Sequence, residues 1–162
     1  MWYAIYTKSG KEDTVAHRLS GIGIEVLNPR LKIKKYKRNK LVEVIEPFFP
    51  CYLFARFDKE KYAHLITYTR GVRYIVGKKN PIVVYDEIID AMREVMEEGG
   101  LVSIKPGRFE KGDKVLIREG PFKDFYGIFE REIKGNERVM ILLEAIHYKI
   151  ELDSNLLTKI KG

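Results

Sequence analysis

The sequence predicts a fold in two parts, a first domain that mixes strands with helices and a second that is a small all-β barrel. Over the first hundred residues, aromatic and β-branched runs alternate with segments of amphipathic helical periodicity. Beyond a stretch rich in glycine and proline, short strand-like runs alternate with turns, which is typical of a small barrel. The 162 residues are enough for two small domains.

A strand and a helix open the chain. Residues 2–7 are mostly aromatic or β-branched and are predicted to form the strand. Ser9 and Glu12 have the spacing of a capping box, in which two side chains bind free backbone amides at a helix start. A helix is therefore expected from about Gly10 to Ser20, with a buried face made of Val15, Ala16 and Leu19.

A hairpin and a further strand follow. Apolar and polar residues alternate over residues 30–46 on both sides of the polar turn 37–40, which indicates a hairpin. Pro47 and Pro50 keep the chain extended before a strand over residues 51–57. Alternation along that strand places Leu53, Ala55 and Phe57 on one face and Tyr52, Phe54 and Arg56 on the other.

Two helices and one strand complete the first domain, residues 1–98. Asp58 and Asp86 are the expected N-caps of the helices, and residues 72–76 form the strand between them. Glycine and proline then mark residues 99–110 as a linker. The second domain, residues 111–162, has strand-like runs at 114–118, 126–130, 138–143 and 149–152.

Composition narrows the function. Thirty Lys and Arg residues against 23 Asp and Glu give a net charge of +7, which favours polyanionic partners, nucleic acid first. One cysteine and three dispersed histidines exclude an internal disulfide and a local zinc motif. No phosphate loop, dinucleotide fingerprint or nucleophile elbow is present. We expect a soluble, cytoplasmic protein that is not an enzyme and has no catalytic residues, metal or cofactor.

The densest charge lies on the predicted hairpin. Seven cations and no acid occupy residues 30–40: Arg30, Lys32, Lys34, Lys35, Lys37, Arg38 and Lys40. On a hairpin they would project from both faces and the tip, a geometry suited to phosphate contacts. The alternative is that the hairpin is only a charged, solvated surface.

Two further patterns have more than one interpretation. Tyr52 and Phe54 are core if a helix of the same domain covers them, and a partner-binding patch if none does; periodicity leaves this open. Cys51 with His64 could be imagined as a nucleophile and its base, although a buried structural thiol is the simpler interpretation.

Motifs across almost the whole chain resemble the NusG family of transcription elongation factors. Residues 2–12 (WYAIYTKSGKE), 47–57 (PFFPCYLFARF) and 69–72 (TRGV) resemble its N-terminal domain. Residues 111–115 (KGDKV) and 120–127 (GPFKDFYG) resemble its C-terminal KOW domain. The resemblance implies an α+β first domain, in which helices flank an antiparallel sheet, and a second domain that is an SH3-like KOW barrel.

The resemblance also implies partners. In the family the N-terminal domain binds the clamp helices of RNA polymerase through its aromatic strand, which maps to Phe48, Tyr52 and Phe54 and favours their exposure. Positions matching Lys8, Arg18 and Arg70 face the non-template DNA strand in sequence-specific relatives, and we add Arg73 as a further nucleic-acid contact. The KOW domain recruits the ribosome or a termination factor.

Several features resemble the specialised members RfaH and LoaP. The sequence has AIHY at residues 145–148 in place of the usual Phe-Gly-Arg loop, and its hairpin is strongly basic. Such a hairpin suits folded RNA better than a flipped DNA base, so we favour a monomeric, LoaP-like regulator that binds a leader RNA hairpin. Recruitment by non-template DNA as in RfaH, or a ribosome-associated KOW protein, are the alternatives.

The resemblance to RfaH also implies an alternative conformation, in which the second domain is helical and docked on the first. We expect instead a constitutive barrel that leaves Tyr52 and Phe54 uncovered. Gly120, Pro121, Gly127 and Gly135 would be costly inside helices and suit barrel turns.

Overall fold

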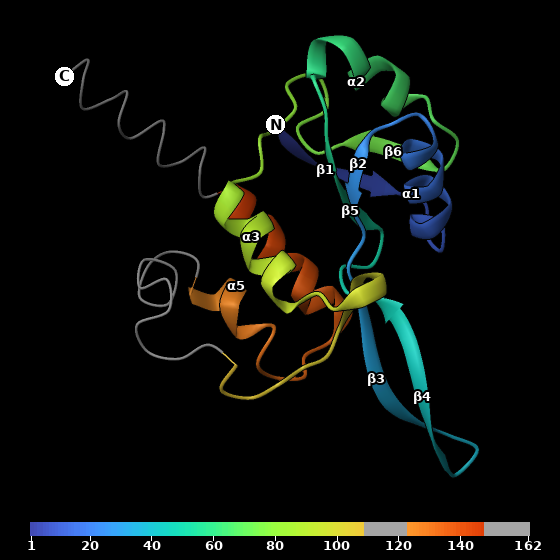
Figure 1. Ribbon diagram of the computed structural model, residues 1–162, viewed down its shortest axis with the longest axis vertical. Coiled ribbons are helices and arrows are strands. Elements are labelled where there is room, and N and C mark those ends of the chain that lie inside the picture. The colour runs from blue at the N-terminus through green and yellow to red at the C-terminus, as the bar shows by residue number, and fades with distance from the viewer. Residues whose placement is uncertain (109–122, 148–162) are drawn as a thin grey trace, which may run out of the picture.

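A four-stranded antiparallel sheet is the centre of the computed structural model, which describes residues 1–108 and 123–147 (Figure 1). Its strand order is β2-β5-β1-β6. The strands are β1 (Trp2–Thr7), β2 (Glu25–Leu27), β5 (Tyr52–Arg56) and β6 (Val72–Ile75). The observed mixture of this sheet with flanking helices agrees with the α+β fold predicted for the first domain.

Both faces of the sheet are buried. One face packs against α1 (Glu12–Gly21) and α2 (Lys59–Thr67), and it carries Tyr3, Ile5, Leu53 and Ala55. The other face packs against α3 (Asp86–Val95), and it carries Trp2, Ala4, Tyr52 and Phe54. Because β1 and β5 are the central strands and both are apolar on two faces, the sheet needs a cover on each side.

The helix starts differ in part from the sequence prediction. Asp58 caps α2 as predicted, since its carboxylate accepts a hydrogen bond from the Glu60 amide at 2.9 Å. The predicted cap at Asp86 is wrong, because Tyr85 is the N-cap of α3 and provides no side-chain bond. The predicted capping box is also wrong: Glu12 begins α1, and its buried carboxylate accepts from the Cys51 amide at 3.1 Å.

The basic hairpin forms as predicted. Strands β3 (Arg30–Lys37) and β4 (Lys40–Pro47) pair antiparallel along their full length, and Figure 1 shows them projecting away from the rest of the fold. Arg38 and Asn39 both have positive φ, the backbone of a two-residue type I′ turn. The one-turn helix η1 (Glu98–Gly100) leads into β7 (Leu101–Val102), which pairs in parallel with β3 near its base.

The C-terminal segment is helical in the described residues, so the strands predicted at 126–130 and 138–143 are wrong here. Helix α5 (Lys123–Gly127) is followed by a second helix over residues 135–147. Two of the glycines that argued against helices lie at helix ends, where they cost little: Gly127 is the last residue of α5, and Gly135 is the first of the next helix. Gly120 and Pro121 lie outside the described residues. The predicted strands at 114–118 and 149–152 lie outside the described residues.

The helix over residues 135–147 follows the helical one of the two apolar patterns. Leu142, Ala145 and Ile146 are buried at helical spacing, whereas Met140 is 61% exposed. This segment packs beside α3 over the sheet face that carries Tyr52 and Phe54 (Figure 1). In the described part of the chain, no helix has the length and apolar character that crossing a membrane requires.

Candidate functional site

The aromatic face implied as a polymerase contact is buried. Phe48 and Phe54 have no exposed surface and Tyr52 is 8% exposed. The expectation that these side chains lie uncovered is therefore wrong for this conformation. Burial raises the pKa of Tyr52 to about 12, and the neighbouring Tyr74 and Tyr6 add to that shift.

Aromatic stacking joins this face to the C-terminal helical segment, residues 123–147. The rings of Phe48 and Phe129 stack with centroids 5.1 Å apart, and those of Phe49 and Phe125 stack at 6.3 Å. Phe125 and Phe129 also contact each other edge to face. Large aromatic rings contribute strongly to interface energies, so these stacked pairs help to hold the segment against the first domain.

A buried arginine adds a polar anchor to the same interface. Arg138 is 2% exposed, and its Nε donates to the backbone carbonyl of Phe48 at 2.6 Å. Its Nη1 donates to the carbonyl of Ile133 at 2.5 Å, and its Nη2 lies 3.5 Å from Oε1 of Glu46. Burial lowers the pKa of Arg138, and the Glu46 carboxylate opposes that shift.

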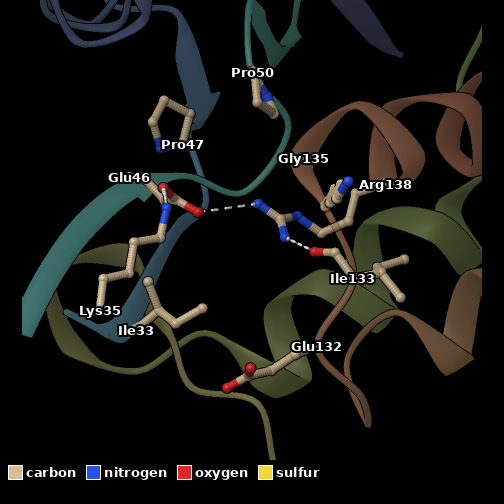
Figure 2. Close-up of a pocket in the computed structure, with 10 residues that line it drawn as sticks. Ile33, Lys35, Glu46, Pro47, Pro50, Glu132, Ile133, Gly135 and Arg138 are labelled. Carbon is tan, nitrogen blue, oxygen red and sulfur yellow. Dashed lines mark hydrogen bonds and ion pairs between the residues drawn. The ribbon is translucent and has the colours of Figure 1, made fainter.

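A pocket of about 560 Å³ opens beside this anchor (Figure 2). Its walls come from the base of the hairpin and from the C-terminal segment, and they include Ile33, Lys35 and Glu132. Lys35 reaches across to Glu46 at 2.7 Å, so one carboxylate is shared between a hairpin lysine and Arg138. The hairpin and the C-terminal segment are therefore coupled through Glu46.

The hairpin cations fall into two groups. Three are held by the protein: Lys32 by Glu43 at 3.4 Å, Lys35 by Glu46, and Arg30 by the carbonyl of Gly99 at 2.7 Å. The others are exposed and make no ion pair within the described residues: Lys34, Lys37, Arg38 and Lys40. Lys37, Arg38 and Lys40 lie at the turn and Lys34 lies midway along β3, and all four are available for phosphate contacts.

The remaining predicted nucleic-acid residues lie elsewhere, near the start of β6. Arg18 donates from Nη1 to the carbonyl of Arg70 at 2.7 Å, and the Lys8 amide donates to the carbonyl of Gly71 at 2.8 Å. The guanidinium of Arg73 lies 5.9 Å from the centroid of the Tyr6 ring. The structure thus brings Lys8, Arg18 and Arg70 together beside α1 and β6, and Figure 1 shows these two elements apart from the hairpin.

The interpretation of Cys51 as a nucleophile loses support. Burial raises the pKa of the Cys51 thiol, and the carboxylate of Glu12 raises it further, which disfavours the reactive thiolate. His64 lies on α2 against the ring of Tyr68, with centroids 4.7 Å apart. Among the residues that the structure describes, no cluster of His, Cys, Asp and Glu has the composition of a metal site.

Sequence reasoning missed Arg138 and its partner Glu46. The available signal was helical spacing, because Arg138, Leu142 and Ile146 repeat every four residues and so share one helix face. A cation on an apolar helix face points to a buried partner. That partner, however, lies 92 positions earlier in the chain, and only the fold brings it near.

Comparison with known proteins gives one family match over the first part of the chain and relatives that align over nearly all of it. The family described as "Transcription termination factor nusG" matches residues 1–93. The transcription termination/antitermination protein NusG of Thermus thermophilus is 27% identical over 183 aligned residues, covering 98% of this chain and 97% of the relative. Its counterpart in Escherichia coli K12 is 24% identical over 172 residues, covering 98% and 95%.

Proposed function

The chain belongs to the NusG family of transcription termination and antitermination factors, and we propose that it is a specialised elongation regulator of the processive antitermination type. The family match over residues 1–93 and the alignment of NusG relatives over 98% of the chain support the family, and the basic hairpin with AIHY at 145–148 supports the specialised type. They favour it over a ribosome-associated KOW protein. In this role the protein binds and positions other molecules and catalyses no reaction.

RNA polymerase is the proposed main partner, through the face that carries Phe48, Tyr52 and Phe54. The family resemblance supplies this assignment, and the apolar, aromatic character of the face suits a protein interface. In the described conformation the C-terminal helical segment occupies that face. The segment and polymerase would then compete for one surface, so this conformation is a closed form that must open before polymerase binds.

The proposed closed form rests on one observation, the stacking of Phe125 on Phe49 and of Phe129 on Phe48. On opening, we propose that the released segment folds as the KOW barrel that the motifs at 111–115 and 120–127 imply. Val139, Ile141 and Leu143 alternate as a strand requires, so the same residues are compatible with both states. The open barrel is then the part that recruits the ribosome or a termination factor.

Nucleic acid is the proposed second partner, bound by the hairpin. The four hairpin cations that make no ion pair in the described residues, three of them at the turn, suit the closely spaced phosphates of a folded RNA, which supports a leader RNA hairpin as the ligand. The alternative, RfaH-like recruitment by non-template DNA, would use Lys8, Arg18, Arg70 and Arg73. An in vitro transcription assay across a terminator, with and without a candidate leader RNA, separates the two.

A polymerase pull-down with one helix variant tests the closed form. Leu142→Asp buries a charge under the C-terminal segment and should release it, because an isolated buried carboxylate is very costly. We expect this variant to bind core RNA polymerase more strongly than the wild type does. Met140→Asp is the matched control, since it adds the same charge to the same helix at an exposed position.

Two outcomes would contradict the proposal. Equal polymerase binding by the wild type, Met140→Asp and Leu142→Asp would mean that the segment does not regulate access. No polymerase binding by any of the three would argue against the polymerase contact itself.

A further inference from the structure

Strand β4 (Lys40–Pro47) is the free edge of the second sheet. The strand order of this sheet is β4-β3-β7, so within the described residues β4 has a strand on one side and none on the other. Over most of its length the hairpin stands clear of the other elements (Figure 1). An edge strand of this kind offers a row of unpaired amides and carbonyls to another chain.

The hydrogen-bond pattern of the hairpin fixes which backbone groups of β4 point outward. The Phe48 amide donates to the carbonyl of Pro29 at 2.9 Å, and in an antiparallel ladder the pairs that exchange hydrogen bonds recur at every second position. In the observed register, residues 40, 42, 44 and 46 therefore bond to β3. The backbone groups of Leu41, Glu43 and Ile45 point away from β3.

The two free edges of the hairpin differ in charge. Four of residues 32–37 on β3 are lysines, and such a run of like charge protects an edge from pairing with itself. On β4, Leu41 is 54% exposed and Ile45 is 51% exposed, and only Glu43 separates these two apolar side chains on their face of the strand. The edge of β4 therefore lacks the protection that β3 has.

The sequence of β4 is complementary to itself when two copies run antiparallel. In residues 40–46, each residue has its complement at the same distance on the other side of Glu43: Lys40 with Glu46, Leu41 with Ile45, and Val42 with Val44. In a pair related by a twofold axis, residue i contacts residue j and residue j contacts residue i. A sequence of this kind therefore forms each favourable contact twice.

This register also uses the outward backbone groups fully. It sets Leu41 opposite Ile45 of the second copy, and Glu43 opposite Glu43, so the residues that point outward would exchange hydrogen bonds across the axis. A shift of two residues in one direction sets Pro47, which has no amide, opposite Leu41. A shift in the other direction sets Asn39 of the turn opposite Ile45.

The one unfavourable pair in this register is Glu43 against its own copy. Like charges directly opposite each other destabilise a sheet. On each hairpin, however, the Lys32 ammonium lies 3.4 Å from the Glu43 carboxylate. Lys32 therefore offsets the repulsion between the two carboxylates.

We propose that β4 pairs antiparallel with β4 of a second copy of this chain and joins the two hairpins in one continuous sheet. Pairing about Glu43 sets the turn of one hairpin beside the base of the other, so the two bodies lie at opposite ends of the paired strands. Each edge is used once, and the association stops at two copies.

The proposed dimer is weak and reversible. One strand from each copy makes an interface of the small, transient class, which buries less than about 1,200 Å² in total. The monomer expected from the sequence then describes the dilute protein. The inference goes beyond the proposed function and does not depend on it, because the pairing needs neither polymerase nor RNA.

Sedimentation velocity of the full chain, from low micromolar to near-millimolar concentration, tests whether the dimer forms. The weight-average sedimentation coefficient should rise with concentration. Leu41→Lys adds a cation at the edge and removes the Leu41–Ile45 contact twice, so the dimer Kd should rise about tenfold or more. The matched control is Tyr36→Lys, which adds the same charge at an exposed position of β3 opposite Leu41, and it should change the Kd much less.

Chemical crosslinking tests the register. In a Cys51→Ser background, Glu43→Cys supplies the chain's one thiol, and the twofold axis places its Cα about 5.5 Å from that of the second copy. A short bismaleimide should therefore join the two copies. Leu41→Cys in the same background is the control: its copy lies four residues along the paired strand, roughly 13 Å away at about 3.4 Å per residue, so it should crosslink several times more slowly.

Three outcomes would overturn the pairing. A monomer at every concentration would exclude a second copy as the partner and leave the edge to an extended segment of another protein. Equal changes in Kd for Leu41→Lys and Tyr36→Lys would exclude the β4 edge, and faster crosslinking of Leu41→Cys than of Glu43→Cys would exclude the register. Melting followed by circular dichroism checks that Leu41→Lys, a change at an exposed position, keeps the fold. The polymerase test with Leu142→Asp is unaffected, so the two proposals fail separately.

Discussion

Arg138 is a buried polar side chain that joins the C-terminal helical segment to the first domain. Its guanidinium lies 4.9 Å from the centroid of the Phe48 ring, and it bonds the Phe48 carbonyl and pairs with Glu46. A buried cation is tolerated only with such partners, because desolvation of a charge is costly. The interaction therefore gives specificity to the docked position of the helix.

We expect Arg138→Met, which keeps most of the side-chain volume, to destabilise the docked segment by about 2 kcal/mol, since two carbonyls lose a donor. That shifts the equilibrium toward the open form roughly thirtyfold. Hydrogen exchange of the amides in residues 139–146 measures this shift toward the open form. Arg131→Met is the control, an exposed cation of the same segment. Equal protection in both variants would contradict the anchor role.

Tyr52 provides a pH-dependent test at the same scale. Burial raises its pKa to about 12 from the ordinary 10.0, so the docked state favours the neutral phenol. The resulting stabilisation is complete below about pH 10 and is lost as the pH rises toward 12. In the Leu142→Asp variant the pKa should fall back toward 10, as followed by NMR of ¹³C-labelled tyrosine. The same pKa in both proteins would mean that the segment does not cover Tyr52.

Among the elements, the β3–β4 hairpin carries two groups of cations that differ in whether the protein itself holds them. Arg30, Lys32 and Lys35 are held by a backbone carbonyl, Glu43 and Glu46, whereas Lys34 and the three cations at the turn make no ion pair in the described residues. Ion pairing lowers the charge available to phosphates. Each cation of the second group should therefore contribute more to nucleic-acid binding than each cation of the first.

Replacing Lys34, Lys37 and Arg38 by Gln should lower RNA affinity and reduce the log-log salt slope by about 0.7 to 0.9 for each phosphate that is no longer neutralised. Replacing Arg30, Lys32 and Lys35 by Gln removes the same charge and should have a smaller effect. Filter binding of a structured RNA at several salt concentrations compares the two triple variants. Identical slopes for both variants and the wild type would leave the hairpin as a solvated surface.

At the scale of the whole molecule, closure and polymerase binding are linked equilibria. If polymerase binds only the open form, its apparent Kd equals the intrinsic Kd divided by the open fraction. The ratio of apparent Kd between the wild type and Leu142→Asp should therefore equal the inverse ratio of their open fractions from hydrogen exchange. A ratio near 1 despite different open fractions would show that polymerase binds both forms alike.

This linkage also changes how the aromatic face must be tested. Phe54 has no exposed surface and belongs to the apolar cluster that includes the C-terminal segment. Truncation of such a core aromatic costs about 3–5 kcal/mol, so the loss of polymerase binding in Phe54→Ala could arise from unfolding. The face is better probed in the opened Leu142→Asp background, with melting measured alongside binding.

Local signals in the sequence predicted most elements of the first domain. The hairpin turn at 37–40, the Asp58 cap and the strand containing Leu53 each depend on interactions within a few residues of each other. The prediction that the charged hairpin is a candidate nucleic-acid-binding surface followed from the same kind of local pattern. The assignments of its residues, of Lys8, Arg18, Arg70 and Arg73, and of the domain boundaries at 98 and 111 remain predictions.

What covers each apolar face was decided only by the tertiary structure. Glu12 bonds the amide of Cys51 in place of its own helix start, and Phe48 stacks on Phe129 from the other end of the chain. Residues 139–143 are apolar at both strand and helix spacing, so their local pattern cannot select between the two. The aromatic face of the first domain selects the helix, because helical spacing places Leu142 and Ile146 together against it. Sequence by itself therefore determines which residues must be buried. The surface against which they pack determines whether they form a helix or a strand.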